Sequence, residues 1–538
     1  MEPRTEILRL QKKLYQENHE KIAAAAEVLD KEFRRYERRY LQAVKSYRKI
    51  AYVPEVEDAM RRANIVLVGD YHTLDQSQRS FIRVLRSYLK TQEKDVVVVL
   101  EAIQARHQGV LDRFLSGTLD DRDFLKKIGF KKHWFFDLWE NYRVIFDFLK
   151  YHEIPVYGLD VSGTTRKGLS ERDAFMARRL SALAKANPNA QIFALVGDLH
   201  LAPPHLPKAI KAAARADNHN LRIVTLYQNS PEIYWKLWKK SAIDHALVVR
   251  LSEDVFCRMH TPPVIAQQSY LNWLYQEDSG FDWVDAKGSF LDLVRQVARI
   301  LDITLSAKAD EVEVYTCGDF GFLKSLAAKK ILKPNELKAL KTRVLKAQSL
   351  FIPQAKAVYL ANVSINRAAE EAGRYLRYLL VGEEGSRSRK DAFYAEILQR
   401  ALGFFGSKLI NAKRKCARTQ DFQHELQYLR SANLIRERVL DYHVAELYLL
   451  SRERLRRGNL LPDGRIATFN PNLAHATARA IGYDLGDHLY YAFIAGHISR
   501  SLVREFFYDE WSGPGVAQQT FLDLYAALQS FKRPAKEL

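Results

Sequence analysis

The sequence predicts an α/β fold for its central part, a mostly parallel sheet flanked by helices, together with an N-terminal helical arm and a C-terminal all-α domain. Between residues 60 and 275, short runs of β-branched residues alternate with amphipathic stretches. These runs are almost entirely apolar, which is typical of parallel strands buried on both faces of a sheet. From residue 285 to 538 the apolar periodicity is mostly helical. The length of 538 residues is enough for about two to four domains.

Residues 1–55 form the predicted helical arm, with one long helix or two in sequence over residues 5–50. Phe33, Tyr36, Tyr40, Val44 and Tyr47 recur at steps of three and four residues, and many lysines and arginines lie between them. This spacing predicts an amphipathic helix with an aromatic stripe and a basic face. We expect the stripe to pack on the rest of the protein. The alternative is that the basic face contacts an anionic partner or a second copy of the chain.

The central domain is predicted from apolar runs and the helical segments between them. The runs that predict the parallel strands are 65–68, 96–100, 154–159, 191–196 and 221–226. The segments that predict the intervening helices are 80–90, 108–115 and 172–186. Two further runs, 246–251 and 255–260, lie close enough to form a hairpin at an edge of the sheet. The prolines at 262 and 263 then end the strand pattern, because proline cannot donate to a ladder.

The sequence of the C-terminal part, residues 285–538, predicts a helical domain. Nothing in this sequence indicates what the helical domain does. The predicted helices are 289–301, 334–349, 352–380, 389–409, 419–452 and 475–508. Residues 311–315 predict an isolated strand. His475, His488 and His497 do not share the four-residue spacing of a helical metal pair, so we expect them to have packing roles.

Composition narrows the functional classes. Lysine and arginine number 83 against 64 acidic residues, a formal net charge of +19, which favours an anionic partner or simply reflects arginine-rich helix surfaces. Three widely separated cysteines argue against a zinc knuckle or a disulfide framework. We find no apolar signal segment and no apolar run of about 20 residues, so we expect a cytoplasmic protein without a membrane span. HExxH, P-loop and GxGxxG motifs are absent.

Ionisable residues follow four of the predicted strands. The pattern Gly-Asp-x-His occurs twice, ending in His72 and in His200, and the two strands between them are followed by Glu101 and Asp160. The carboxyl ends of parallel strands meet at one edge of a sheet, where open α/β folds bind their ligands. We therefore expect one site that includes these residues and the motif aspartates Asp70 and Asp198.

The order of these motifs resembles that in ChaN-like proteins. They belong to a superfamily that also contains erythromycin esterases and Tiki/TraB proteins. The matching segments, all within the central domain, are Val68-Gly69-Asp70-Tyr71-His72, Leu100-Glu101-Ala102, 111–117, 139–142, 154–160, 172–177 and Val196-Gly197-Asp198-Leu199-His200.

The resemblance implies a bacterial-type ChaN-like protein whose ligand is a small molecule or haem. Tyr71 and Tyr142, with Asp70, Asp160 and Asp198, are then the candidate cofactor-binding residues. Asp70 stands where the superfamily commonly has glutamate. The chain shows neither a signal peptide nor a lipobox cysteine, so we do not expect an iron-uptake role at the cell surface.

Three functions remain open from the sequence. The first is a hydrolase in which His72, Glu101 and His200 activate water, either without a metal or as ligands of a divalent ion. The second is a binding module for haem or a similar planar ligand, with the helical domain mediating assembly, including a homo-oligomer. The third is an inactive scaffold whose basic segments bind an anionic surface.

Overall fold

The computed structural model describes residues 3–25, 31–90, 94–130, 138–161, 168–277, 286–316, 321–345, 348–361, 365–382, 385, 387–431 and 434–534. The chain forms two compact units, which are described separately. Among the described residues, the α/β unit comprises Leu14–Glu277, and the helical unit comprises residues 3–13 and 286–534. The division therefore falls inside the first helix, α1 (Pro3–Ala25), after Lys13.

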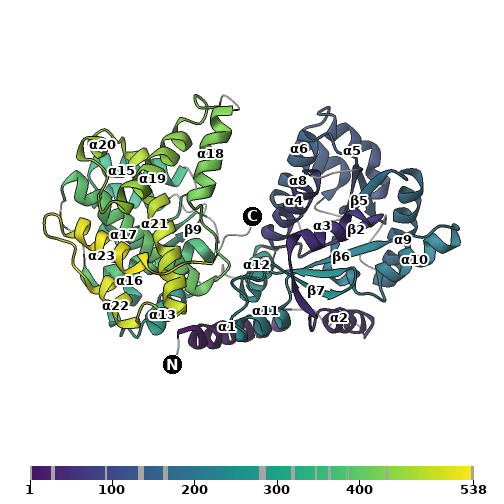
Figure 1. Ribbon diagram of the computed structural model, residues 1–538, viewed down its shortest axis with the longest axis horizontal. Helices are drawn as coiled ribbons and strands as arrows, with labels where there is room; N and C mark the ends of the chain where they lie inside the picture. The colour runs from purple at the N-terminus through teal and green to yellow at the C-terminus, as the bar shows by residue number, and fades with distance from the viewer. Residues whose placement is uncertain are drawn as a thin grey trace. The chain divides into compact units, whose positions relative to one another are not determined.

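The α/β unit is built on an eight-stranded sheet with the order β1-β7-β8-β6-β2-β5-β3-β4 (Figure 1). The strands are β1 (Lys49–Ala51), β2 (Ile65–Asp70), β3 (Asp95–Gln104), β4 (Val156–Asp160), β5 (Ala190–Gly197), β6 (Ile223–Gln228), β7 (Val248–Ser252) and β8 (Val255–Arg258). The six strands from β8 to β4 are mutually parallel, and β7 runs antiparallel to both of its neighbours, β8 and β1. This confirms the predicted α/β fold with its mostly parallel sheet.

Helices flank this sheet (Figure 1). They are α2 (Lys31–Ala43), α3 (Val53–Arg61), α4 (Asp75–Leu89), α5 (Gln108–Leu115), α6 (Asp121–Ile128), α8 (Trp139–Tyr151), α9 (Leu169–Ala186), α10 (Leu206–Ala216), α11 (Pro231–Lys239) and α12 (Pro263–Glu277), with 3-10 turns η1 (Ala105–His107) and η2 (Asp198–Leu201). The apolar side chains of β2, β3 and β5 are fully buried, as parallel strands covered on both faces require. The core continues into α4, α5 and α8 through Phe81, Phe114 and Phe146.

The N-terminal segment differs from the prediction at its end. Residues 5–50 were expected to be helical throughout, but the helices cover Pro3–Ala25 and Lys31–Ala43, and β1 pairs with β7 in the sheet. The predicted hairpin of β7 and β8 is present, although β1 rather than β7 forms the edge of the sheet. A strand of three residues leaves too few alternations to be recognised from its sequence.

The helical unit contains α13 (Ala286–Ile300), α14 (Gly321–Ala328), α15 (Pro334–Leu345), α16 (Ile365–Val381), α17 (Arg389–Ile410), α18 (Thr419–Ser431), α19 (Val439–Arg456), α20 (Asp463–Ala467), α21 (Pro471–Ile494), α22 (Arg500–Tyr508) and α23 (Val516–Gln529). It includes two 3-10 turns, η3 (Ala307–Glu311) and η4 (Pro353–Ala355), and a three-stranded sheet of β10 (Leu350–Ile352), β11 (Ala357–Leu360) and β9 (Glu313–Thr316). The single helix predicted over 352–380 is therefore wrong in its first part, and the strand predicted near 311–315 is paired rather than isolated. None of the helices within the described ranges has both the length and the apolar character needed to cross a bilayer.

Candidate functional site

Polar side chains from the carboxyl ends of β2, β3, β4 and β5 gather in one place, and we call this group the rim cluster. Its members are Tyr36, Asp70, His72, Glu101, Tyr142, Asp160, Arg172, Asp173 and His200. The members from the strand ends lie close together because β2, β5 and β3 are adjacent and parallel, so their carboxyl ends lie at the same edge of the sheet. Helices α2, α8 and α9 add the remaining members.

His72 is held by a buried aspartate. Its Nδ1 lies 2.9 Å from Oδ2 of Asp70, which also accepts hydrogen bonds from the Tyr142 hydroxyl at 2.6 Å and, at Oδ1, from the Gln78 amide at 2.5 Å. Because Asp70 is the common acceptor, we assign the Nδ1 proton to His72. Burial alone would lower the pKa of His72, but the Asp70 carboxylate raises it above its ordinary value.

His200 is held in the same manner from another part of the chain. Its Nδ1 lies 2.7 Å from Oδ1 of Asp173 and 2.9 Å from the Tyr36 hydroxyl, which donates to the other Asp173 oxygen at 2.7 Å. The Tyr36 ring stacks on His205 with centroids 3.5 Å apart. Burial, then the charge of Asp173, raises the pKa of Tyr36, so its hydroxyl remains a donor. The side chain of His200 is 4% exposed, against 17% for His72.

Glu101 lies between the two histidines and is bound by Arg172. The guanidinium of Arg172 donates to Oε1 of Glu101 at 2.5 Å and to both oxygens of Asp160 at 3.1 Å. The Gly197 amide donates to Oε2 of Glu101 at 2.6 Å, and Nε2 of His200 lies 3.6 Å from Oε1. Burial alone would raise the pKa of Glu101, but the charges near it, His200 and Arg172 first, lower it. Glu101 is therefore an ionised carboxylate within a buried site.

Gly197 marks the point where the two halves of the rim cluster meet. A Cβ atom at this position would lie 3.0 Å from Nε2 of His72 and 3.4 Å from Oε2 of Glu101. Both groups therefore face one small volume above the backbone of β5, and the His72 ring presents Nε2, not Nδ1, to it. A larger residue at 197 would occupy the space that the imidazole and the carboxylate share.

The structure places two predicted residues outside the rim cluster. Asp198 turns toward Gly69, where its carboxyl fills the space that a side chain at 69 would take. Among the described residues its Oδ1 has no hydrogen-bond partner, and burial, then the nearby Asp70, raises its pKa to about 8. Tyr71 is partly buried, and burial together with Tyr270 raises its pKa. The side chains of Asp198 and Tyr71 therefore lie beside the rim cluster and are not members of it.

Three members of the rim cluster were not predicted as site residues. Arg172 and Asp173 lie near the start of α9, which follows β4. The signal that could have found them is their place at the start of the predicted helix 172–186. Tyr36 belongs to the aromatic stripe of α2, and no sequence feature separates it from the other tyrosines there. Its contact with His200 spans 164 residues, which only the folded chain reveals.

Comparison with known proteins agrees with this architecture. The family model described as "Haem-binding uptake, Tiki superfamily, ChaN" matches residues 56–171. The α/β unit contains a ChaN-like domain. The resemblance predicted from the strand-end motifs is thereby confirmed. The matched segment of the ChaN-like domain includes Asp70, His72, Glu101 and Asp160 and ends before Arg172.

The search of solved structures also matched the structure titled "Cofacial heme binding to ChaN of Campylobacter jejuni", at 16% sequence identity and a TM-score of 0.28. The match covers 35% of this chain and 90% of that one. A search of curated protein sequences found no match.

The structure describes the surroundings of the residues proposed as haem or metal ligands. Tyr142 is 1% exposed and its hydroxyl donates to Asp70, while burial raises the pKa of Tyr71. In the part of the chain that the structure describes, no group of three His, Cys, Asp or Glu side chains is arranged to hold a metal ion. Arg172 further places a positive charge directly on Glu101, which would repel a cation there.

Proposed function

We propose that the rim cluster is the site of a metal-independent hydrolase, in which His72 activates a water molecule beside Glu101. One observation carries this proposal: two imidazoles, each bonded to an aspartate through Nδ1, turn their Nε2 atoms toward the same carboxylate. An aspartate in this position fixes the ring and stabilises the imidazolium that forms when Nε2 accepts a proton.

The two histidines differ in how they can act. His72 is the more exposed, and the Asp70 carboxylate raises its pKa above the ordinary value, which strengthens Nε2 as a general base. His200 is deeper and faces Oε1 of Glu101. We assign to His200 the role of positioning Glu101. The ionised oxygens of Glu101 would orient the attacking water.

The scheme uses water as the nucleophile. Cys257 is buried, and burial, then Asp198, raises its pKa well above the ordinary value, so it is held as a thiol. The Arg172 side chain is 21% exposed, and its guanidinium would stabilise negative charge that develops on a substrate carbonyl or phosphoryl oxygen. Esters, amides and phosphoesters are therefore the substrate classes to test.

The second candidate function is haem binding, which the ChaN-like family match favours. This function would have to use residues other than His72, Tyr142 and His200, because those side chains are engaged in the rim cluster. Haem titration of the full chain distinguishes the candidates. A Soret change that survives substitution of both histidines would support haem binding at another surface of the domain.

The hydrolase is tested with panels of chromogenic esters, amides and phosphoesters in the presence of a chelator. We expect turnover by the full chain that is unaffected by the chelator and falls by at least about a hundredfold in H72Q, the loss typical of a missing general base. The matched control is H152Q, because His152 is exposed at the end of α8 in the same unit. Turnover that is absent from every panel, or equal in H72Q and H152Q, would contradict the proposal.

A further inference from the structure

The outer side of helix α2 carries a concentration of cations. The inner side of the helix is fixed to the α/β unit, because the Tyr36 ring stacks on His205 and the Tyr40 ring contacts Tyr227. The opposite side of α2 and the turn that follows it are exposed to solvent. We call the exposed cations there the basic face, and its members are Arg34, Arg35, Arg38, Arg39 and Lys45.

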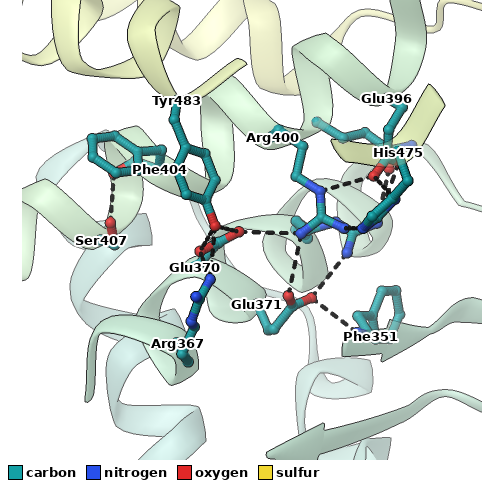
Figure 2. Close-up of polar contacts among 12 residues, drawn as sticks. Phe351, Arg367, Glu370, Glu371, Glu396, Arg400, Phe404, Ser407, His475 and Tyr483 are labelled. Atoms are coloured by element: carbon teal, nitrogen blue, oxygen red, sulfur yellow. Dashed lines mark hydrogen bonds and ion pairs between the residues drawn. The ribbon is translucent and has the colours of Figure 1, made fainter. Parts of the chain in front are cut away.

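The cations of the basic face have no carboxylate partners, unlike the buried arginines of the helical unit. Figure 2 shows Arg400 between three carboxylates, those of Glu370, Glu371 and Glu396, so its charge is balanced inside the protein. Over the described residues, no member of the basic face forms an ion pair with a carboxylate. Positive charge that no internal partner balances is available to an anionic partner outside the protein.

The acidic residues of α2 do not offset this charge. The 13 residues of the helix include four arginines and one lysine against two glutamates, Glu32 and Glu37. Glu32 faces the start of α9, where the Ser170 hydroxyl donates to its Oε1 at 3.4 Å. Glu37 is only partly exposed. The basic face is therefore dominated by charge of one sign.

Lysines of α11 extend the positive surface past the end of α2. Nζ of Lys236 donates to the backbone oxygen of Lys45 at 2.8 Å, and Nζ of Lys240 lies 5.7 Å from the centroid of the Tyr47 ring. Lys239 is exposed on the same helix. Two elements that are far apart in the sequence thus bring their cations side by side. A positive surface of this extent suits a polyanion better than a single small anion.

An exposed leucine within the basic face favours one kind of polyanion. Leu41 follows Arg38 by three residues and Arg34 by seven, so the three side chains lie on the same side of α2. Leu41 is 51% exposed. A leucine among arginines gains nothing from the phosphate backbone of a nucleic acid. At a bilayer, by contrast, it can enter the boundary between the headgroups and the acyl chains.

We propose that the basic face docks the protein on an anionic membrane surface. The arginines and lysines would bind the phosphates and carboxylates of lipid headgroups, and Leu41 would enter the acyl boundary. The same helix supplies Tyr36 to the rim cluster, so a docked chain would hold the rim cluster near the bilayer. The proposal concerns binding alone and does not depend on hydrolysis.

Flotation of the full chain with vesicles of phosphatidylcholine and phosphatidylserine tests this inference. We expect binding that is absent with phosphatidylcholine alone and that weakens as salt is added. The triple variant R34Q/R35Q/R38Q should bind about a hundredfold more weakly, since each cation near an anionic bilayer contributes about fivefold. L41S should bind about threefold to tenfold more weakly, because it lacks the apolar contact.

The matched control is R122Q/K126Q/K127Q, which removes three exposed cations from α6, at a distance from α2 in the same unit (Figure 1). It should bind the vesicles as the unmodified chain does. Equal losses in the two triple variants, or no binding by the unmodified chain, would overturn the assignment.

Duplex DNA and RNA are the competing probes. Nucleic acid binding that R34Q/R35Q/R38Q loses and L41S keeps, with no preference of the unmodified chain for the anionic vesicles, would also overturn the membrane assignment. Thermal melting of each variant establishes that a loss of vesicle binding is not a loss of fold.

Discussion

Replacement of Arg172 by methionine tests the electrostatics of the rim cluster without knowledge of the substrate. Arg172 balances two buried carboxylates, Glu101 with 3% of its side chain exposed and Asp160 with 13%. Removal of one partner from a buried ion pair costs about 3–5 kcal/mol. Because Arg172 itself is 21% exposed, we expect the lower end, about 3 kcal/mol. In a domain of this size that loss corresponds to a melting temperature lower by about 6–12 °C.

The cost should depend on pH with a definite sign. Without Arg172, burial would raise the pKa of Glu101 above its ordinary 4.5 and would raise that of Asp160 further above 3.8. The folded variant would then hold protons that the unfolded chain releases, so its stability falls as the pH rises past these values. The difference between R172M and the unmodified chain should increase as the pH rises from 4 to 7. Part of it should already be present at pH 4, because Glu101 of the unmodified chain has a pKa of about 2.

Thermal unfolding of the full chain, followed by circular dichroism between pH 4 and pH 8, measures this difference. R179M is the matched control, because Arg179 lies on the same helix and donates to the carbonyl of Gly158 and to Gln108, which are uncharged. Its effect should not change over this range. A loss in R172M that is independent of pH, or a loss below about 1 kcal/mol at pH 7, would refute the buried ion-pair network.

Three further predictions concern the same unit. G197A places a Cβ atom 3.0 Å from His72 Nε2 and should slow hydrolysis about tenfold to a hundredfold. G109A is the control and should keep the rate, because a Cβ atom there meets nothing within 4 Å. Equal rates of the two variants would contradict the shared volume at Gly197. Y36F removes the hydroxyl bonded to Asp173 and His200 and should lower the free energy of unfolding by about 1–3 kcal/mol in denaturant titrations, with no change as the opposing result. D198N should become more stable relative to the unmodified chain as the pH rises from about 3.8 to about 8. The reason is that folded Asp198 retains its proton in this window, whereas the unfolded residue does not. Melting temperatures of the two proteins that follow parallel pH profiles would exclude a protonated Asp198.

The sequence predicted the sheet well because its strands are long and apolar. The runs at 65–68, 96–100 and 191–196 all lie within the strands β2, β3 and β5. The order in which these strands pair was not predicted and comes from the structure. The region 352–380 was misjudged because the strand Ala357–Leu360 is an apolar segment of four residues next to a helix. Strand and helix periodicities cannot be separated over so short a run.

The site residues that lie near the ends of predicted strands could be predicted from the sequence. The site residues that reach the cluster only through tertiary contacts could not. Asp70 ends β2 and His72 closely follows it, whereas Glu101 follows the predicted run 96–100 but lies within β3, which continues to Gln104. The pairing of His72 with Asp70 could be anticipated from their proximity in the chain, but the pairing of His200 with Asp173 could not. Asp198 stays a predicted ligand-site residue: its motif repeats that of Asp70, but it begins the 3-10 turn η2 and its side chain lies against Gly69.

Nitrogen-15 NMR of the imidazoles in the full chain, labelled at histidine and assigned with H72Q and H200Q, tests most directly whether both rings face Glu101. Replacement of Glu101 by glutamine removes a charge that raises the pKa of His72 and lies 3.6 Å from Nε2 of His200. We predict that E101Q lowers the titration midpoint of His72 and shifts the Nε2 resonance of His200, while both rings keep the proton on Nδ1. Resonances of the two histidines that are unchanged in E101Q would contradict a single site.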